Sequence, residues 1–189
     1  MDWFAMERQL NPHLRAGDLA ICSEQITQAI RALPNSPFHL ATQLHFTNDS
    51  LEVANHIDGF LFKARDSIDV HALYAEANGF DINPDLWFFS LFAFDSYGGH
   101  RDYDWLSDFQ YEDVHGLTLT GMERLQVVYA SDAYPDPQYE AAARLASLYV
   151  VVAFQSLIQR SARLATSLSC PLLATAHDYQ FIYEFKPAA

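Results

Sequence analysis

An apolar stripe at helical spacing is the first clear pattern along the chain. Apolar residues recur every three or four positions, as one face of an amphipathic helix requires, at Leu19, Cys22, Ile26, Ile30 and Leu33. Asp18 precedes the stripe as a candidate N-cap, and Pro34 follows it as a residue that ends helices. We therefore predict a helix over residues 19–33.

Two further helices are predicted in the next part of the chain. The cap cluster Asn48-Asp49-Ser50 is followed by Glu52, which lies three residues after Asp49 as in a capping box. The buried stripe of this helix would consist of Val53, Ala54, Ile57 and Leu61. A short helix over residues 70–78 would end at Gly79, because glycine tolerates the left-handed conformation of a helix C-terminus.

Three stretches have the patterns of strands. Residues 38–46 alternate, with His39 and His45 on the face opposite the two phenylalanines. Residues 86–94 are apolar on both faces, which predicts a central strand that is covered on both sides. Residues 179–185 alternate between aromatic residues and a mixed face, which predicts a strand near the C-terminus.

The strongest helix signals lie in the C-terminal half. Thr120 and Glu123 fit a capping box for a helix that reaches about residue 131. Asp136-Pro137 combines an N-cap with proline at the first helical position, and predicts a long helix to about residue 168. Its middle, SLYVVVAFQSL, is apolar nearly all round, so we place it in the domain centre or in a homodimer interface.

The order of these elements indicates the fold class. Helices and strands follow one another irregularly rather than in a repeated strand–helix alternation. We therefore predict an α+β fold, with a mainly antiparallel sheet packed against several helices, including one long apolar C-terminal helix. A three-layer α/β fold is the alternative. The 189 residues contain no linker or repeat, and we expect a single globular domain over residues 1–189.

Charge and composition narrow the choice of partners. The chain has 24 acidic and 11 basic residues, for a formal net charge of -13. This balance argues against binding to nucleic acid or anionic membranes, and indicates either a basic partner or a role in solubility. Two separated cysteines, no secretory signal and an apolar run at residues 145–154 that is shorter than a membrane span favour a cytoplasmic protein.

The segment of residues 95–113 combines acidic and aromatic side chains after the apolar run. Its carboxylates would pair with Arg or Lys of a partner, and its rings would supply stacking and cation-π contacts. Arg101 is its one fixed positive charge. Residues 103–110 alternate and predict either a strand or an ordered loop. The candidate partner-binding residues are Asp95, Tyr97, His100, Asp102, Tyr103, Asp104, Trp105, Asp108 and Tyr111.

Other interpretations of this segment remain open. Trp105 and Phe109 could belong to the core, with Gly98-Gly99 as a hairpin turn and the carboxylates simply solvated. His100 with two aspartates could instead bind a divalent metal ion, or paired carboxylates could serve a hydrolase. No nucleophile elbow, phosphate-binding loop or dinucleotide-binding motif occurs in the sequence. We accordingly predict no cofactor and favour binding over catalysis.

Three strings have the appearance of fixed landmarks of a bacterial family: NGFDINPDLWFF, GGHRDYDWLSDF and LTGMERLQ. In overall size and charge the chain resembles the small, acidic, cytosolic immunity proteins of bacterial toxin systems. The resemblance implies a stoichiometric inhibitor, whose acidic face would occlude a basic toxin active site. It transfers no individual site residue.

Overall fold

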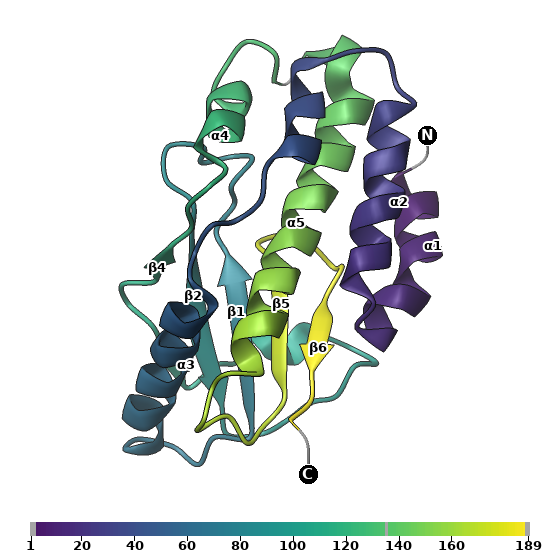
Figure 1. Cartoon of the computed structure of the whole chain (residues 1–189). Coiled ribbons are helices and arrows are strands. Elements are labelled where there is room, and N and C mark those ends of the chain that lie inside the picture. Colours follow the sequence, from purple (N-terminus) through teal and green to yellow (C-terminus); the bar gives the residue numbers. More distant parts are fainter. Residues whose placement is uncertain (1–2, 135, 188–189) are drawn as a thin grey trace.

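A mixed six-stranded sheet, counted over the described residues, forms one layer of the fold (Figure 1). The computed structural model describes residues 3–134 and 136–187. The strand order is β3-β2-β1-β5-β6, and β4 pairs with β2 on the same side as β3. The strands are β1 (Ala72–Ala77), β2 (Phe88–Phe94), β3 (Tyr111–Glu112), β4 (Leu117–Thr118), β5 (Leu172–Ala176) and β6 (Tyr183–Phe185). The β1–β5 pair is parallel and the others are antiparallel, which confirms the predicted fold class.

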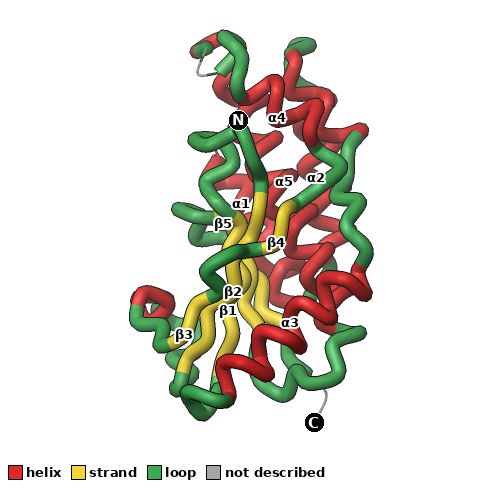
Figure 2. Tube along the Cα trace, turned by 90° about the vertical axis from the view of Figure 1, so that its left-hand side faces the viewer, coloured by secondary structure: helices red, strands yellow, loops and turns green. Residues whose placement is uncertain are grey.

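Helices form the second layer, on one face of the sheet. They are α1 (Trp3–Ala16), α2 (Leu19–Arg31), α3 (Ser50–Arg65), α4 (Glu123–Tyr129) and α5 (Glu140–Ala162), with 3-10 turns η1 (Pro37–Gln43), η2 (Asp104–Ser107) and η3 (Pro137–Tyr139). Figure 1 shows α5 crossing in front of the sheet, with α3 on one side and α2 on the other. Figure 2, turned by 90°, shows that mainly loop covers the opposite face.

The long helix α5 lies in the domain centre, the first of its two predicted positions. Asp136 caps the 3-10 turn η3 that leads into it, because the Asp136 side chain accepts a hydrogen bond from Gln138 N–H at 2.9 Å. Fully buried side chains point to several sides of the helix, including Leu148, Val152 and Phe154. The helix ends at Ala162, earlier than predicted. By length and composition the helical residues 137–162 could cross a membrane. However, 72% of their most apolar 18-residue stretch is buried inside the protein, as in a core helix.

The two predicted helices of the first third are confirmed as α2 and α3. The carboxylate of Asp49 accepts a hydrogen bond from Leu51 N–H at 2.8 Å and so caps α3. Asp18 occupies the N-cap position of α2 without a side-chain cap bond. The predicted α3 stripe is fully buried, and consists of Val53, Ala54, Ile57 and Leu61.

The strand predicted over residues 179–185 is confirmed only for its last three residues, as β6. Two other predicted elements have the wrong secondary structure, and each has a local or tertiary cause. Residues 38–46 do not form a strand, because Pro37 starts the 3-10 turn η1 and Ser36 N–H donates to His39 Nδ1 at 3.2 Å. Residues 70–78 do not form a helix. Their helix-forming Ala, Leu and Glu residues are overridden by pairing on both sides, with β2 and with β5, so this segment becomes β1.

The landmark string NGFDINPDLWFF closes the connection between β1 and β2. Asn78 bonds across it twice, from its side-chain N–H to Leu86 O and from Phe88 N–H to its side-chain O, both at 3.0 Å. Trp87 Nε1 donates to Phe80 O at 3.0 Å while its ring is buried. Asn78 and Trp87 of this string therefore have structural roles.

The string LTGMERLQ also has a structural explanation. Gly121 has a φ of +101°, and a Cβ at this position would lie 2.4 Å from His45 O, so only glycine fits. Glu123 accepts a hydrogen bond from Gly121 N–H at 2.8 Å, while Thr120 bonds to Thr47. The expected capping box from Thr120 to Glu123 is thus replaced by two separate contacts.

The sheet has two different faces. One faces the helices and buries Leu73, Ala75, Phe89, Leu91 and Ala174 in the main core. The other forms a smaller apolar cluster around Tyr74, Phe94 and Leu173. The acidic-aromatic segment that follows β2 covers part of this second face, where Phe94 is buried but Phe88, Ser90 and Phe92 are only partly buried. The prediction that β2 is covered on both sides therefore holds at the Phe94 end of the strand alone.

Candidate functional site: two pockets beside the acidic loop

Residues 95–110, here called the acidic loop, leave the end of β2 and return to the same strand. Tyr111 pairs with Ala93, so both ends of the loop lie at one edge of β2. Gln110 holds them together, because its side-chain oxygen accepts from Asp95 N–H at 2.9 Å and its own N–H donates to Ala93 O at 3.0 Å. The loop contains the 3-10 turn η2 and does not form the alternative strand over residues 103–110.

Trp105 anchors the acidic loop to the sheet. Its ring lies edge-on to Phe94, with centroids 4.8 Å apart, and its Nε1 donates to Gly99 O at 3.0 Å. Tyr103, Trp105 and Leu106 all pack against the small cluster on the second face of the sheet. Trp105 therefore serves the core, as one of the two interpretations of the sequence proposed. Phe109 is partly a core residue and partly a surface residue, since its ring packs against Phe92 while 41% of the residue is exposed.

The aspartates of the acidic loop remain on the surface. All four are exposed, and none forms an ion pair with a described residue: Asp95, Asp102, Asp104 and Asp108. Their contacts within the loop are local. Asp102 Oδ1 accepts from Asp104 N–H at 2.9 Å, and Gln110 donates to the backbone oxygen of Asp108. The loop thus presents unneutralised carboxylates above an apolar base.

The predicted tyrosines and His100 do not gather in one place. Tyr97 donates its hydroxyl proton to Glu184 Oε1, and burial together with this bond raises the pKa of Tyr97 above its usual value. Tyr111 lies on the helix side of the sheet, where its ring centroid is 5.5 Å from that of Phe60. His100 lines a pocket on the α1 side of the loop. Tyr103 is the one predicted tyrosine that borders the loop carboxylates.

A groove of about 570 Å³, here called the acidic groove, lies between the acidic loop and the β5–β6 connection. Three carboxylates line it, from Asp102, Asp104 and Asp178, with Arg101 as a single cation. Three phenol rings also line it, from Tyr74, Tyr103 and Tyr179. Burial is the main cause that raises the pKa of Tyr74, Tyr103 and Tyr179, so these rings are neutral.

Three of the six carboxylate and phenol side chains that line the acidic groove come from residues that sequence reasoning did not select. Tyr74 lies on β1, which was predicted as a helix, and Tyr179 and Asp178 follow the unpredicted strand β5. Asp178 has a φ of 67°, a conformation that aspartate tolerates better than most residues.

A second pocket, here called the basic pocket, lies on the other side of Tyr103. It has a volume of about 590 Å³ and is lined by segments of α1, α5, the acidic loop and β6. Arg15, Arg163, Lys186 and His100 face it, together with Asp18 and Glu184. His100 therefore shares a pocket with two carboxylates from outside the acidic loop.

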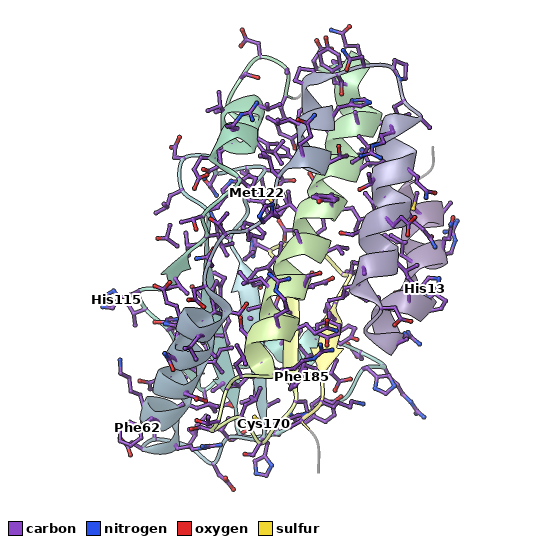
Figure 3. The ribbon with its side chains drawn as sticks, in the orientation of Figure 1. His13, Phe62, His115, Met122, Cys170 and Phe185 are labelled. Carbon is purple, nitrogen blue, oxygen red and sulfur yellow. The ribbon has the colours of Figure 1, made fainter. Side chains whose placement is uncertain are left out.

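A histidine–carboxylate pair lies at the end of the Asp-rich segment. His56 Nε2 is 2.9 Å from Asp113 Oδ2, and the side chains are 23% and 15% exposed. Both line a pocket of about 320 Å³ between α3 and residues 111–115. Figure 3 shows His115 and Phe62, on this side of the molecule, pointing away from the ribbon.

The described residues give little support to metal or thiol chemistry. No group of three or more His, Cys, Asp or Glu side chains among them is arranged to hold a metal ion. Cys22 and Cys170 are both buried, and burial raises the pKa of each thiol to about 11. Thiols with such a pKa are protonated at neutral pH and are poor nucleophiles.

Comparison with known proteins adds no relative. No protein-family model, no curated protein sequence and no solved structure matches the chain.

Proposed function

We propose that this protein is a non-enzymatic binding protein that captures a basic protein partner through the acidic groove. The observation that carries the proposal is the pairing of Asp102, Asp104 and Asp178 with the rings of Tyr74, Tyr103 and Tyr179 around one space. Carboxylates attract a guanidinium or ammonium group, and tyrosine faces stabilise the same cation. We expect one Arg or Lys side chain of the partner to enter this groove.

The wider charge distribution supports the same kind of partner. The loop carboxylates Asp95 and Asp108 extend the acidic surface beyond the groove, and the whole chain carries a net charge of -13. Such a field accelerates encounters with a basic protein and makes the association rate depend on ionic strength. The anchored loop presents these charges in a fixed arrangement, which lowers the entropy that binding must lose.

We further propose that the partner is a toxin and that the protein acts as a cytoplasmic immunity protein in a bacterium. Its size, its acidity and the predicted preference for a basic partner are the features that it shares with that class. In this role the acidic groove would hold a cationic side chain of the toxin and cover its active site.

Affinity capture with a charge-matched pair of variants tests the proposal. The groove variant carries Asp102→Asn, Asp104→Asn and Asp178→Asn. Asparagine retains the side-chain oxygen that accepts from Asp104 N–H, and it tolerates the positive φ at position 178. The control carries Asp66→Asn, Asp85→Asn and Asp132→Asn, three exposed positions outside the groove, with the same change in net charge.

Each tagged protein is incubated with lysate of the source cells at low and moderate salt. We expect the wild type and the control to capture one basic partner in a stoichiometric, salt-sensitive manner. The association rate constant of the groove variant with the isolated partner should be at least about tenfold lower than that of the wild type. Absence of a basic partner, or equal capture by the groove variant and the control, would contradict the proposal.

A second candidate function, hydrolysis with a histidine base, is favoured by the 2.9 Å ion-pair contact between His56 Nε2 and Asp113 Oδ2 beside a pocket. Both of these atoms are buried and their geometry is not that of a hydrogen bond, so Nδ1 of His56 would take the proton. A histidine oriented by a carboxylate can take a proton from an attacking water molecule. Asp113 belongs to the Asp-rich segment that the sequence indicated for such chemistry. A panel of ester, phosphoester and glycoside substrates would test it, with His56→Gln as the inactive reference. Equal turnover by the wild type and His56→Gln would exclude this role.

A further inference from the structure

The basic pocket stands out because its charge is opposite to that of the chain. The sequence has more than twice as many acidic as basic residues, yet Arg15, Arg163 and Lys186 converge on one space of about 590 Å³. They come from the last turn of α1, the C-terminal end of α5 and the residue after β6. Folding therefore brings together three cations that are separated by more than 20 positions in the sequence.

The two arginines of the basic pocket have no partner among the described residues. Neither guanidinium forms an ion pair or a hydrogen bond there. Lys186 is different, because its Nζ lies 3.3 Å from Glu184 Oε2. The other carboxylate oxygen, Glu184 Oε1, accepts a hydrogen bond from the Tyr97 hydroxyl. Glu184 is thus already occupied by a cation and a phenol, and Asp18 is the pocket's remaining carboxylate. Arg15 and Arg163 keep unused donors for a ligand.

The base of the basic pocket is fixed by Gln159. Its Nε2 donates to Gly17 O at 2.8 Å and to Tyr183 Oη at 3.1 Å, which joins α5 to the α1–α2 turn and to β6. Gly17 has a φ of +76°, and a Cβ there would lie 3.2 Å from the same Gln159 nitrogen. The turn that follows Arg15 is therefore held in place by a side chain of the central helix.

The phenol of Tyr183 offers a further donor. Its oxygen accepts from Gln159, and no described group accepts its proton. Burial, as the main cause, raises the pKa of Tyr183, so the hydroxyl stays protonated at neutral pH. A neutral phenol that lines the same pocket as two guanidinium groups provides, together with them, hydrogen-bond donors of the kind that an anionic oxygen requires.

We propose that the basic pocket binds a small molecule through a phosphate group, held by Arg15, Arg163 and the hydroxyl of Tyr183. Two guanidinium forks and a phenol offer more donors than one carboxylate can accept, whereas a phosphate has three terminal oxygens and up to two charges. Tyr103, Ile182 and Phe185 supply the apolar part of the lining, against which the remainder of the ligand would pack. Figure 3 shows Phe185 beside the lower end of α5.

Both arginines also lie at helix C-termini, where a cation stabilises the helix dipole without any ligand. The test must therefore separate ligand binding from a purely structural role. The site variant carries Arg15→Gln and Arg163→Gln. The control carries Arg31→Gln on α2 and Arg124→Gln on α4. Both positions are exposed, and the control removes the same number of charges as the site variant. Tyr183→Phe removes only the proposed phenol donor.

Isothermal titration of the full chain with inorganic phosphate, at an ionic strength matched with sodium chloride, measures the binding. We expect saturable binding by the wild type and the control, at least about tenfold weaker binding by the site variant, and an intermediate effect of Tyr183→Phe. Acetate should bind more weakly than phosphate. No saturable binding to the wild type would overturn the proposal. So would unchanged phosphate affinity in the site variant, even if its melting temperature fell, since the arginines would then be structural.

Discussion

The ring of Trp105 occupies the space beside Gly98 that any larger residue would need. A Cβ on residue 98 would lie 2.3 Å from Trp105 Cδ1, closer than two carbon atoms that are not bonded to each other can approach. Trp105 in turn donates to Gly99 O and packs on Phe94. Gly98-Gly99 therefore does more than form a turn, because the absence of a side chain at Gly98 allows the acidic loop to pack against the sheet.

Gly98→Ala should loosen the acidic loop and lower the free energy of unfolding by about 1–3 kcal/mol, because the indole ring must move. Chemical unfolding followed by tryptophan fluorescence measures the change. Gly59→Ala is the matched control, since nothing lies within 4 Å of a Cβ at that position in α3. It should stabilise the protein by about 0.5–1 kcal/mol. Equal effects of the two substitutions would refute the packing role of Gly98.

Asp58 should contribute to stability at neutral pH and lose this contribution in acid. Burial alone would raise the pKa of Asp58, but hydrogen bonds from Thr166 and Ser167 outweigh burial and lower it. When the folded-state pKa is lowered, the ionised group stabilises the protein at pH values above its unfolded-state pKa of about 4. This contribution disappears as the pH falls through the folded-state pKa.

Asp58→Ala should therefore reduce the free energy of unfolding by about 1 kcal/mol at neutral pH. The carboxylate holds the turn after α5 through contacts at 2.8 Å to Thr166 N–H and 2.9 Å to Ser167 N–H. Urea unfolding at several pH values measures the difference, which should vanish in strong acid. Asp85→Ala, at an exposed position in a loop, is the control. A pH-independent difference would show that the charge of Asp58 is not involved.

His177 should make stability depend on pH in the opposite sense. The hydrogen bond between His177 Nδ1 and Glu76 Oε1, at 3.0 Å, is the main cause that raises the pKa of His177. When the folded-state pKa is raised, the group's contribution to the free energy of unfolding is complete at pH values below its unfolded-state pKa of about 6.5. The contribution is lost as the pH rises through the folded-state pKa.

Glu76→Gln should return the pKa of His177 towards its ordinary value, which an NMR titration of the imidazole protons measures directly. His177→Gln should be less stable than the wild type at mildly acidic pH and equal to it at high pH. His115→Gln, at an exposed position, serves as the control and should show no such dependence. An unchanged His177 titration in Glu76→Gln would rule out Glu76 as the cause.

Gln155 should be hard to replace although it lies in an apolar helix. Its side-chain nitrogen donates to Ala174 O at 3.1 Å and to Phe181 O at 2.6 Å, inside the core. Gln155→Leu would remove this donor from both carbonyl groups, and Phe181 O would keep only the Thr175 hydroxyl at 3.0 Å, at a cost of about 1–2 kcal/mol. Thermal unfolding compares it with Gln180→Leu, which changes an exposed position and should have a small effect. A Gln155→Leu variant as stable as the wild type would contradict this role.

The sequence alone determined the elements whose signals are local. Each of these signals depends on residues within a few positions of one another: the apolar stripes of α2 and α3, the cap at Asp49, and the Asp136-Pro137 start of η3, which leads into α5. The apolar run of β2 and the irregular order of elements were enough to predict an α+β fold. The acidic loop was recognised for the same reason, because its charges and rings are adjacent in the chain.

Only the tertiary structure decided what those residues face. The β1 segment favours a helix by its composition, and it becomes a strand because β5, about a hundred residues later, pairs with it. Trp105 is turned towards the sheet by Phe94, while Asp178 and Tyr179 arrive beside Asp102 from the far end of the chain. The convergence of Arg15, Arg163 and Lys186 has the same origin. Such contacts depend on which distant segments share the burial of apolar surface, and local patterns do not contain that information.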